Sequence, residues 1–306
     1  MTLRTGHVLG RFTVVSLLAQ GGVGAAALAG CKSAPDPASV APPVASVAPA
    51  PEAPVFASHD PLRPSVVAFR SGPNELHGFL YRPAGNGPFP AIVFNHGSER
   101  LPGPMTGQAE FYVNHGFVLF VPHRRGHGRS SDVGRYIEDV LREKSDDPQV
   151  FVDELVAQLD DVMAAIAYVG SLPGVDPKRI AVSGCSLGGI ESLLAAERGA
   201  GIVAAIDFAG ASVTWASNAA LQERMKRAAR NAKVPVFFLQ AENDYDTAPS
   251  KVLSEEMRLA GKPARVHVFP PRGSTPDEGH GFCRGGERPP WGEEVLAFLK
   301  EAMTPR

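Results

Sequence analysis

The sequence is poor in cysteine and tryptophan, and its charges nearly cancel. Its 306 residues include three Cys and two Trp, and 30 basic residues stand against 32 acidic ones. It has no long basic run and no basic patch interleaved with aromatic residues, so nothing in it predicts nucleic-acid binding. The hydrophobic fraction of 44% is that of an ordinary globular protein with a sizeable core.

The three cysteines do not predict a metal site. Cys31, Cys185 and Cys283 form no CxxC pair and no His/Cys cluster with the spacing of zinc ligands.

The basic, histidine-containing stretch at residues 123–130 has glycines after an apolar run, which favours a tight hydrogen-bonded turn. It also lacks the carboxylates or thiolates that commonly complete a metal site beside histidines. We expect neither a metal nor a cofactor.

An uncharged stretch rich in Val, Leu, Ala and Gly occupies residues 12–30, after two arginines. A charged start, an apolar middle and small residues at the end predict a secretory signal peptide over residues 1–30. The alternative is a transmembrane helix. It is disfavoured because Gln20 and the glycines at 21, 22 and 24 make the segment only mildly hydrophobic.

Leu28-Ala29-Gly30-Cys31 resembles the lipobox of bacterial lipoproteins. The resemblance implies cleavage before Cys31 and several lipid chains on that residue, enough for stable membrane attachment. Lys32, rather than Asp, follows the cysteine. By the sorting habit of the lipoproteins that this segment resembles, that residue favours the outer membrane. We therefore expect a protein held in the cell envelope by lipid, facing the periplasm or the surface.

The next segment, residues 31–64, predicts a tether. Residues 32–64 contain 9 Pro and 8 Ala and little apolar bulk, so they cannot form a packed core. Fully extended, at about 3.1 Å per residue, such a segment spans roughly 100 Å. The working domain is then expected over residues 65–306.

Within that domain, short apolar runs alternate with amphipathic segments. This pattern predicts an α/β fold with a mostly parallel central sheet, helices on both faces and a site at the carboxyl ends of the strands. In the helix expected before residue 170, apolar residues recur with a 3.6-residue period. We expect its carboxylates, Asp153, Glu154, Asp160 and Asp161, to face water. Strands are expected at 66–70, 75–81, 91–94, 117–121, 180–183, 203–208, 236–240 and 265–269, and helices at 105–115, 152–169, 188–198, 218–231, 250–260 and 292–303.

Gly184-Cys185-Ser186-Leu187-Gly188 lies between an expected strand and an expected helix. That context predicts a G-x-S-x-G nucleophile elbow, a turn so tight that only glycine fits at its flanks. It presents the Ser186 hydroxyl as a candidate nucleophile. The alternative is a plain glycine-rich turn.

A serine nucleophile needs a base, itself oriented by an acid, and in such folds the order along the chain is Ser, acid, His. Asp244 follows the expected strand at 236–240 and is the candidate acid, with Asp246 as its rival and Glu242 as a loop residue. His280 lies between two glycines in an expected loop and is the candidate base. His267 alternates along a strand and is expected to be structural.

The oxyanion of an acyl-transfer intermediate needs two donors. Leu187 opens the helix after the nucleophile, so its N–H is the first candidate. The loop after the third strand begins Asn95-His96-Gly97-Ser98, and the Ser98 N–H is the second. We expect His96 to brace this loop and Glu99 to face water.

The sequence contains five blocks that belong together, namely His77–Pro83, Asn95-His96-Gly97, Arg125–Ser130, Val175–Ile180 and the Ser186 elbow. They resemble the dienelactone-hydrolase-like branch of the α/β-hydrolase superfamily, and the resemblance extends over about residues 66–300. Similar blocks occur in acetyl xylan esterases and in prolyl-oligopeptidase-type catalytic domains. Dienelactone hydrolases proper carry cysteine where this chain has Ser186, so the resemblance implies an esterase-type serine enzyme and not lactone-specific chemistry. The segment at 208–234 is too short for a large cap, which favours small or polymer-borne esters.

The sequence therefore predicts a serine hydrolase that cleaves carboxylic esters. A peptidase or amidase of the prolyl-oligopeptidase type is the alternative among enzymes, and a non-catalytic lipoprotein binding module is the alternative of another class. Cys185 and Cys283 each lie near a candidate triad residue and would approach each other if Ser186 and His280 do. Whether they form a disulfide stays open.

Overall fold

The computed structural model describes residues 60–144 and 147–304. These residues all belong to a compact unit that spans residues 50–306. The predicted signal peptide, Cys31 and most of the predicted tether lie outside the described residues.

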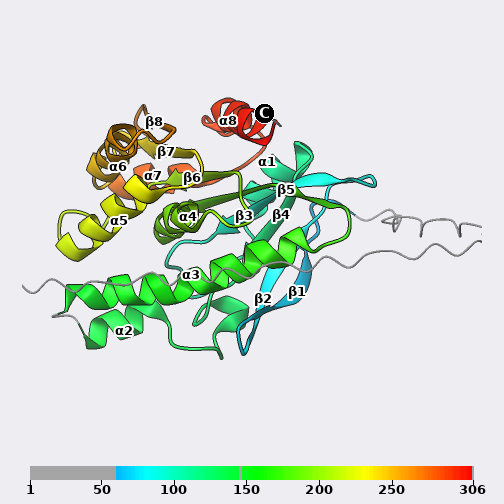
Figure 1. Cartoon of the computed structure of the whole chain (residues 1–306), viewed down its shortest axis with the longest axis horizontal. Helices are drawn as coiled ribbons and strands as arrows, with labels where there is room; N and C mark the ends of the chain where they lie inside the picture. Colours follow the sequence, from blue (N-terminus) through cyan, green and yellow to red (C-terminus); the bar gives the residue numbers. More distant parts are fainter. Residues whose placement is uncertain (1–59, 145–146, 305–306) are drawn as a thin grey trace, which may run out of the picture. The chain divides into compact units, whose positions relative to one another are not determined.

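The described residues form one eight-stranded sheet with the order β1-β2-β4-β3-β5-β6-β7-β8 (Figure 1). The strand β2 pairs antiparallel with β1 and β4, and the other neighbours pair parallel. The carboxyl ends of β3 to β8 therefore share one edge, where sites form in such sheets. The strands are β1 (Ser65–Ser71), β2 (Asn74–Tyr81), β3 (Phe89–Asn95), β4 (Val118–Pro122), β5 (Val175–Cys185), β6 (Ala204–Phe208), β7 (Val236–Ala241) and β8 (Ala264–Phe269).

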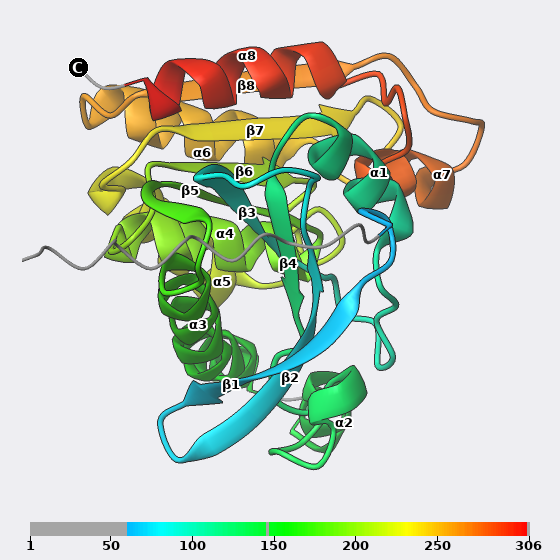
Figure 2. The ribbon, with the colours of Figure 1, turned by 90° about the vertical axis from the view of Figure 1, so that its right-hand side faces the viewer.

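Helices cover both faces of the sheet. Five of them, α2 to α6, contribute to the apolar core on one face, and α1 and α8 to the core on the other. Figure 2 shows α8 and α3 on opposite sides of the strands. The helices are α1 (Thr106–Asn114), α2 (Ile137–Glu143), α3 (Pro148–Gly170), α4 (Leu187–Arg198), α5 (Ala219–Asn231), α6 (Ala248–Leu259), α7 (Pro276–His280) and α8 (Gly292–Met303), with short 3₁₀ turns η1 (Gly128–Ser130) and η2 (Gly281–Cys283).

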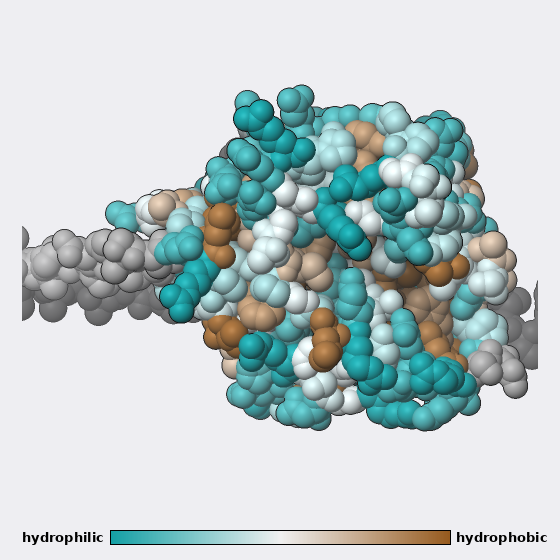
Figure 3. Space-filling view, turned by 180° about the vertical axis from the view of Figure 1, so that it is seen from behind, coloured by the Kyte–Doolittle hydropathy of each residue, from teal (hydrophilic) through white to brown (hydrophobic). Residues whose placement is uncertain are grey.

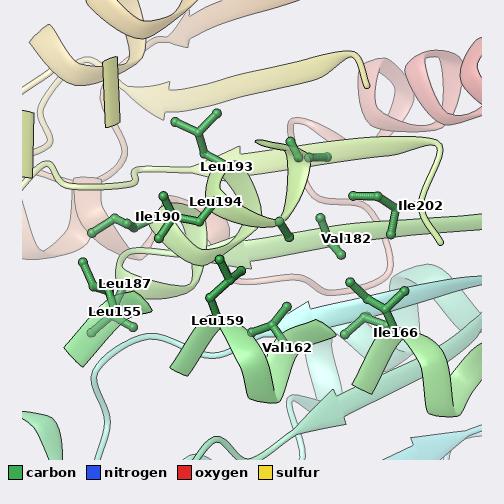
Figure 4. Packing of buried hydrophobic residues seen from close by; sticks show 14 of the residues in the cluster. Leu155, Leu159, Val162, Ile166, Val182, Leu187, Ile190, Leu193, Leu194 and Ile202 are labelled. Carbon is green, nitrogen blue, oxygen red and sulfur yellow. The ribbon is translucent and has the colours of Figure 1, made fainter. Parts of the chain in front are cut away.

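The central strands alternate their side chains between the two cores. On β3, Val93 joins the core under α3 and α4, while Ile92 and Phe94 join the core under α1 and α8. Both faces are buried, which is why these strands read as continuous apolar runs. Figure 4 shows leucine and isoleucine side chains of α3 and α4 packed over Val182 of β5. Burying one such side chain stabilises the fold by about 1.5–3 kcal/mol.

The predicted α/β fold is confirmed, and every expected strand and helix is present with its ends shifted by a few residues. The short helices α2 and α7 were not expected. The prediction for Asp161 was wrong. Its side chain is fully buried and accepts hydrogen bonds from Ser71 Oγ and from the backbone and side chain of Arg125. A periodicity argument on α3 alone misses it, because the burial comes from β1 and the turn after β4.

Hydrophilic residues dominate the face shown in Figure 3, and hydrophobic residues form smaller areas among them. Large apolar side chains that are exposed, such as Leu101, Val213 and Val266, come from different elements. Within the part of the chain that the structure describes, no helix is both long and apolar enough to cross a membrane.

Candidate active site

Ser186 occupies a strained turn between β5 and α4. Its backbone has φ 57° and ψ −120°, a region that side chains with a Cβ rarely adopt and that costs about 1–3 kcal/mol. The Ser186 N–H donates to the carbonyl of Phe208 at the end of β6, which ties the turn to the neighbouring strand. The predicted elbow geometry is therefore present.

The glycines beside Ser186 are required by close approach. A Cβ on Gly184 would lie 2.1 Å from the Gly188 carbonyl oxygen, and a Cβ on Gly188 would lie 2.0 Å from the Asn95 carbonyl oxygen. Both distances are far below van der Waals contact. The G-x-S-x-G pattern thus lets β5, the first turn of α4 and the end of β3 meet without side chains between them.

Asp244 lies just after β7 and is hydrogen-bonded to His280. Its Oδ1 is 2.9 Å from His280 Nδ1, and Gln240 Nε2 donates to its Oδ2 at 2.8 Å. Burial alone would raise the pKa of Asp244, but the hydrogen bonds from His280, Ser212 and Gln240 and the charge of His280 lower it below its ordinary value. Asp244 is therefore an ionised acceptor at neutral pH.

Asp246, the rival for the acid, has a different role. Its carboxylate accepts from the backbone N–H of Ala248, the first residue of α6, while its carbonyl accepts from Gln240. Glu242 is exposed in the loop. The structure thus brings Asp244, and neither of the other two, against the candidate base.

His280 is the last residue of α7 and not part of an irregular loop as the sequence indicated. The helix forms because Thr275 and Glu278 make a reciprocal capping box and Pro276 opens the first turn. A Cβ on Gly279 would lie 2.6 Å from the Asn243 backbone, so glycine lets α7 approach the Asp244 loop. Gly279, one of the two glycines that predicted a loop, therefore serves close packing.

Ser212 is a further polar residue at this pair, and sequence reasoning missed it. Its Oγ donates to Asp244 Oδ1 at 2.6 Å and lies 3.2 Å from His280 Nδ1. It follows β6 through a turn in which Ala209 and Ala211 have positive φ. A serine beyond the carboxyl end of a parallel strand was the available signal.

The candidate oxyanion residues lie beside the nucleophile. Leu187 is the first residue of α4. Ser98 lines a pocket of about 790 Å³ together with Ser186 and His280, and the same three residues line an adjoining pocket of about 290 Å³. The two pockets therefore meet at the predicted reactive centre. Glu99 is exposed, as expected, and it also lines the larger pocket. His96 is buried, and its Nδ1 lies 2.9 Å from the Gly97 carbonyl oxygen, which agrees with its predicted role of bracing the loop.

A disulfide joins Cys185 and Cys283. Cys185 directly precedes Ser186, and Cys283 ends the 3₁₀ turn after His280, so the bond ties the two segments that carry the nucleophile and base candidates. Both cysteines line the larger pocket. The question that the sequence left open is thus answered. No group of three or more His, Cys, Asp or Glu suited to a metal occurs within residues 60–144 and 147–304.

Comparison with known proteins supports the α/β fold described above. The model of the dienelactone hydrolase family matches residues 76–296. The quorum-quenching protein AidA of Acinetobacter baumannii is 33% identical over 132 residues, which cover 42% of this chain and 38% of AidA. The protein usf of Aquifex pyrophilus is 25% identical over 78% of this chain and 99% of its own length.

Solved structures show the same fold at low identity. A putative dienelactone hydrolase from Klebsiella pneumoniae superimposes with a TM-score of 0.59 at 16% identity, covering 78% of this chain and 98% of its own. The Pyrococcus horikoshii acylaminoacyl peptidase gives 0.60 at 19% identity, and this chain matches 41% of its length. With the family model spanning most of the described residues, the chain belongs to the dienelactone hydrolase family of α/β hydrolases.

Proposed function

We propose that this hydrolase cleaves carboxylic esters through an acyl-enzyme on Ser186. The observation that carries the proposal is the strained, elbow-held Ser186 in the same pocket as a hydrogen-bonded Asp244–His280 pair. A serine hydroxyl is a weak nucleophile that such a base activates, and a carboxylate at the other ring nitrogen holds the base in the required tautomer.

The reaction follows from these roles. Ser186 Oγ attacks the ester carbonyl carbon while His280 Nε2 takes the hydroxyl proton, and the Leu187 and Ser98 N–H groups receive the oxyanion. The bond to the alkoxide then breaks, and His280 returns its proton to that oxygen. Water attacks the acyl-enzyme with His280 again as base. As the bond between the acyl carbon and Ser186 Oγ breaks, His280 gives the water proton to Oγ, which releases the acid and restores the Ser186 hydroxyl.

Ser186, and not Ser212, is the nucleophile in this proposal. Ser212 Oγ lies on the Nδ1 side of the His280 ring, the side that Asp244 occupies. With Nδ1–H donating to the carboxylate, the basic nitrogen is Nε2, on the opposite side of the ring. Ser212 therefore orients the Asp244–His280 pair.

Steady-state hydrolysis of p-nitrophenyl acetate and of the matched p-nitroanilide tests the proposal. We expect turnover of the ester and its loss by at least about 10³-fold in Ser186→Ala, because triad members act as a unit. The control is Ser171→Ala, which removes an exposed serine at the end of α3. Faster turnover of the anilide than of the ester would favour an amidase or peptidase, and unchanged ester turnover in Ser186→Ala would overturn the proposal.

The two pockets indicate the form of the substrate. Apolar side chains from α2, α3, α4 and the turn after β6 line the smaller pocket. We therefore propose that this pocket takes a short apolar group of the ester. They include Ile137, Leu141, Phe151, Ile190 and Val213. The second group of the ester, or the polymer that carries it, would occupy the larger pocket.

Val213 offers a test, because its side chain is 56% exposed and lines the smaller pocket. We expect Val213→Trp to lower turnover of p-nitrophenyl hexanoate more than that of the acetate. Val266→Trp is the matched control, since Val266 is 43% exposed on β8 and lines a different pocket. An unchanged ratio of the two rates in Val213→Trp would contradict this use of the pocket.

We further propose that lipid on Cys31 anchors the protein in the cell envelope, on the sequence pattern alone. Labelling of cells with an alkyne fatty acid tests it. The full chain should carry the label and a Cys31→Ala chain should not. Equal labelling of the two chains would reject the anchor.

A further inference from the structure

The turn after β4 holds the loop that carries the Ser98 N–H. Four successive carbonyl groups, of residues 97 to 100, accept hydrogen bonds. Tyr136 Oη donates to the Ser98 carbonyl at 2.6 Å, and the Gly128 N–H donates to that of Arg100 at 2.8 Å. His127 Nδ1 lies 3.0 Å from the Glu99 carbonyl oxygen. The histidine-containing segment at residues 123–130, expected to form a hydrogen-bonded turn, thus supports this loop.

The Gly97 carbonyl is held by two side chains. Arg124 Nη2 donates to it at 2.9 Å, and His96 Nδ1 lies 2.9 Å from it. The Arg124 backbone N–H points to His96 Nε2 at 3.5 Å. Arg124 Nη2 also lies 3.3 Å from His96 Nδ1, so the two side chains that hold the Gly97 carbonyl contact each other. We assign the tautomer in which Nε2 accepts from the Arg124 backbone N–H and Nδ1 donates to the Gly97 carbonyl. Burial and the charge of Arg124 lower the pKa of His96 well below its ordinary value, so the ring stays neutral.

The Gly97 carbonyl and the Ser98 N–H belong to one peptide unit. In a planar trans peptide these groups point in opposite directions, so fixing the carbonyl fixes the direction of the N–H. Ser98 lines both pockets beside Ser186. Arg124 is fully buried, and its Nε also donates to Gln158 Oε1 at 2.8 Å. The guanidinium is therefore held at two points behind the loop.

We propose that Arg124, with His96, is a positioning residue for oxyanion stabilisation, because it fixes the Gly97–Ser98 peptide so that the Ser98 N–H faces the reacting carbonyl. This inference rests on the proposed function. Arg124 touches neither the substrate nor Ser186 in this role. Its loss leaves the nucleophile and base intact but lets the peptide rotate, so the transition state loses more than the ground state.

The test compares Arg124→Met with Arg125→Met. Arg125 is the matched control, since it is the adjacent arginine and its guanidinium pairs with Asp161 and not with the loop. Two quantities are measured in each variant. These are kcat and KM on p-nitrophenyl acetate, and Ki for a trifluoromethyl ketone, whose adduct with a serine carries an oxyanion.

We expect Arg124→Met to lower kcat and to raise Ki in parallel, by roughly 10- to 100-fold, with KM little changed. Arg125→Met should change both by less than about threefold, whatever it does to the melting temperature. A merely structural Arg124 would lower the melting temperature without this parallel change. A folded Arg124→Met with wild-type kcat and Ki overturns the inference.

A second pair of variants applies if Arg124→Met does not fold. In His96→Asn the amide keeps an N–H near the place of Nδ1, while His96→Leu removes it. We expect the Asn variant to retain most of kcat and the Leu variant to lose it, and equal values in the two would overturn the inference. A wild-type chain that neither turns over the ester nor binds the ketone overturns the proposed function as well.

Discussion

Opening the Cys185–Cys283 disulfide should destabilise the domain. The bond closes a loop of 98 residues, and a cross-link over a loop of about 100 residues removes chain entropy equivalent to about 4.7 kcal/mol from the unfolded state. Measured effects are commonly smaller, so we expect about 2–4 kcal/mol. For a domain of this size that corresponds to a fall of roughly 4–16 °C in melting temperature.

Denaturant unfolding of three samples measures this effect. They are the oxidised wild type, the wild type with dithiothreitol, and the double variant Cys185→Ala/Cys283→Ala. Reductant should reach the bond because both cysteines line the larger pocket. The reduced wild type separates the cross-link from the packing of the sulfur atoms, since it keeps both side chains.

Loss of the disulfide should also lower ester turnover, because the bond ties the residue beside Ser186 to the turn after His280. We expect ester turnover to fall by about 10- to 100-fold in the folded double variant, because misplacement of a catalytic group by about 1 Å can cost up to about 100-fold in rate. Reduction of the double variant is the control and should change nothing. Equal unfolding midpoints for oxidised and reduced wild type would refute the reasoning.

Three further substitutions have definite expected outcomes. Gly188→Ala should give little folded protein, because its Cβ would lie 2.0 Å from the Asn95 carbonyl oxygen; a soluble variant with wild-type melting would contradict this contact. Ser212→Ala should lower kcat by about 10-fold without abolishing it, because Asp244 loses one of several donors; complete inactivity would contradict a positioning role. Glu191→Gln should flatten the pH dependence of unfolding between pH 4.5 and 8. Burial raises the pKa of Glu191 from 4.5 to about 8, so the unfolded chain loses this proton first and the wild-type free energy of unfolding falls as pH rises through that window; parallel wild-type and variant curves would contradict it.

The sequence predicted those features that depend on local pattern. The Ser186 elbow, the strand–helix alternation and the order of Asp244 and His280 all follow from short-range spacing. The preference for Asp244 over Asp246 was made from position alone. The structure shows its physical basis, since the Asp246 carboxylate accepts from the backbone at the start of α6 while Asp244 accepts from His280.

The features that sequence reasoning missed depend on contacts between distant segments. Asp161 looks like part of a polar helix face, and only the approach of Arg125 and Ser71 buries it. Ser212 is one polar residue in a turn until the fold brings it to Asp244. Arg124 is one of several basic residues in its segment, and the sequence does not distinguish it from its neighbours. Its proposed positioning role follows only from its contact with the Gly97 carbonyl.

Mass mapping after treatment with a fluorophosphonate probe tests the central claim most directly. The wild-type chain should carry one adduct, on the peptide that contains Ser186, and His280→Ala should lose it because the serine is then no longer activated. Ser212→Ala should still be labelled on Ser186. An adduct on Ser212, or a folded protein without any adduct, would contradict the account.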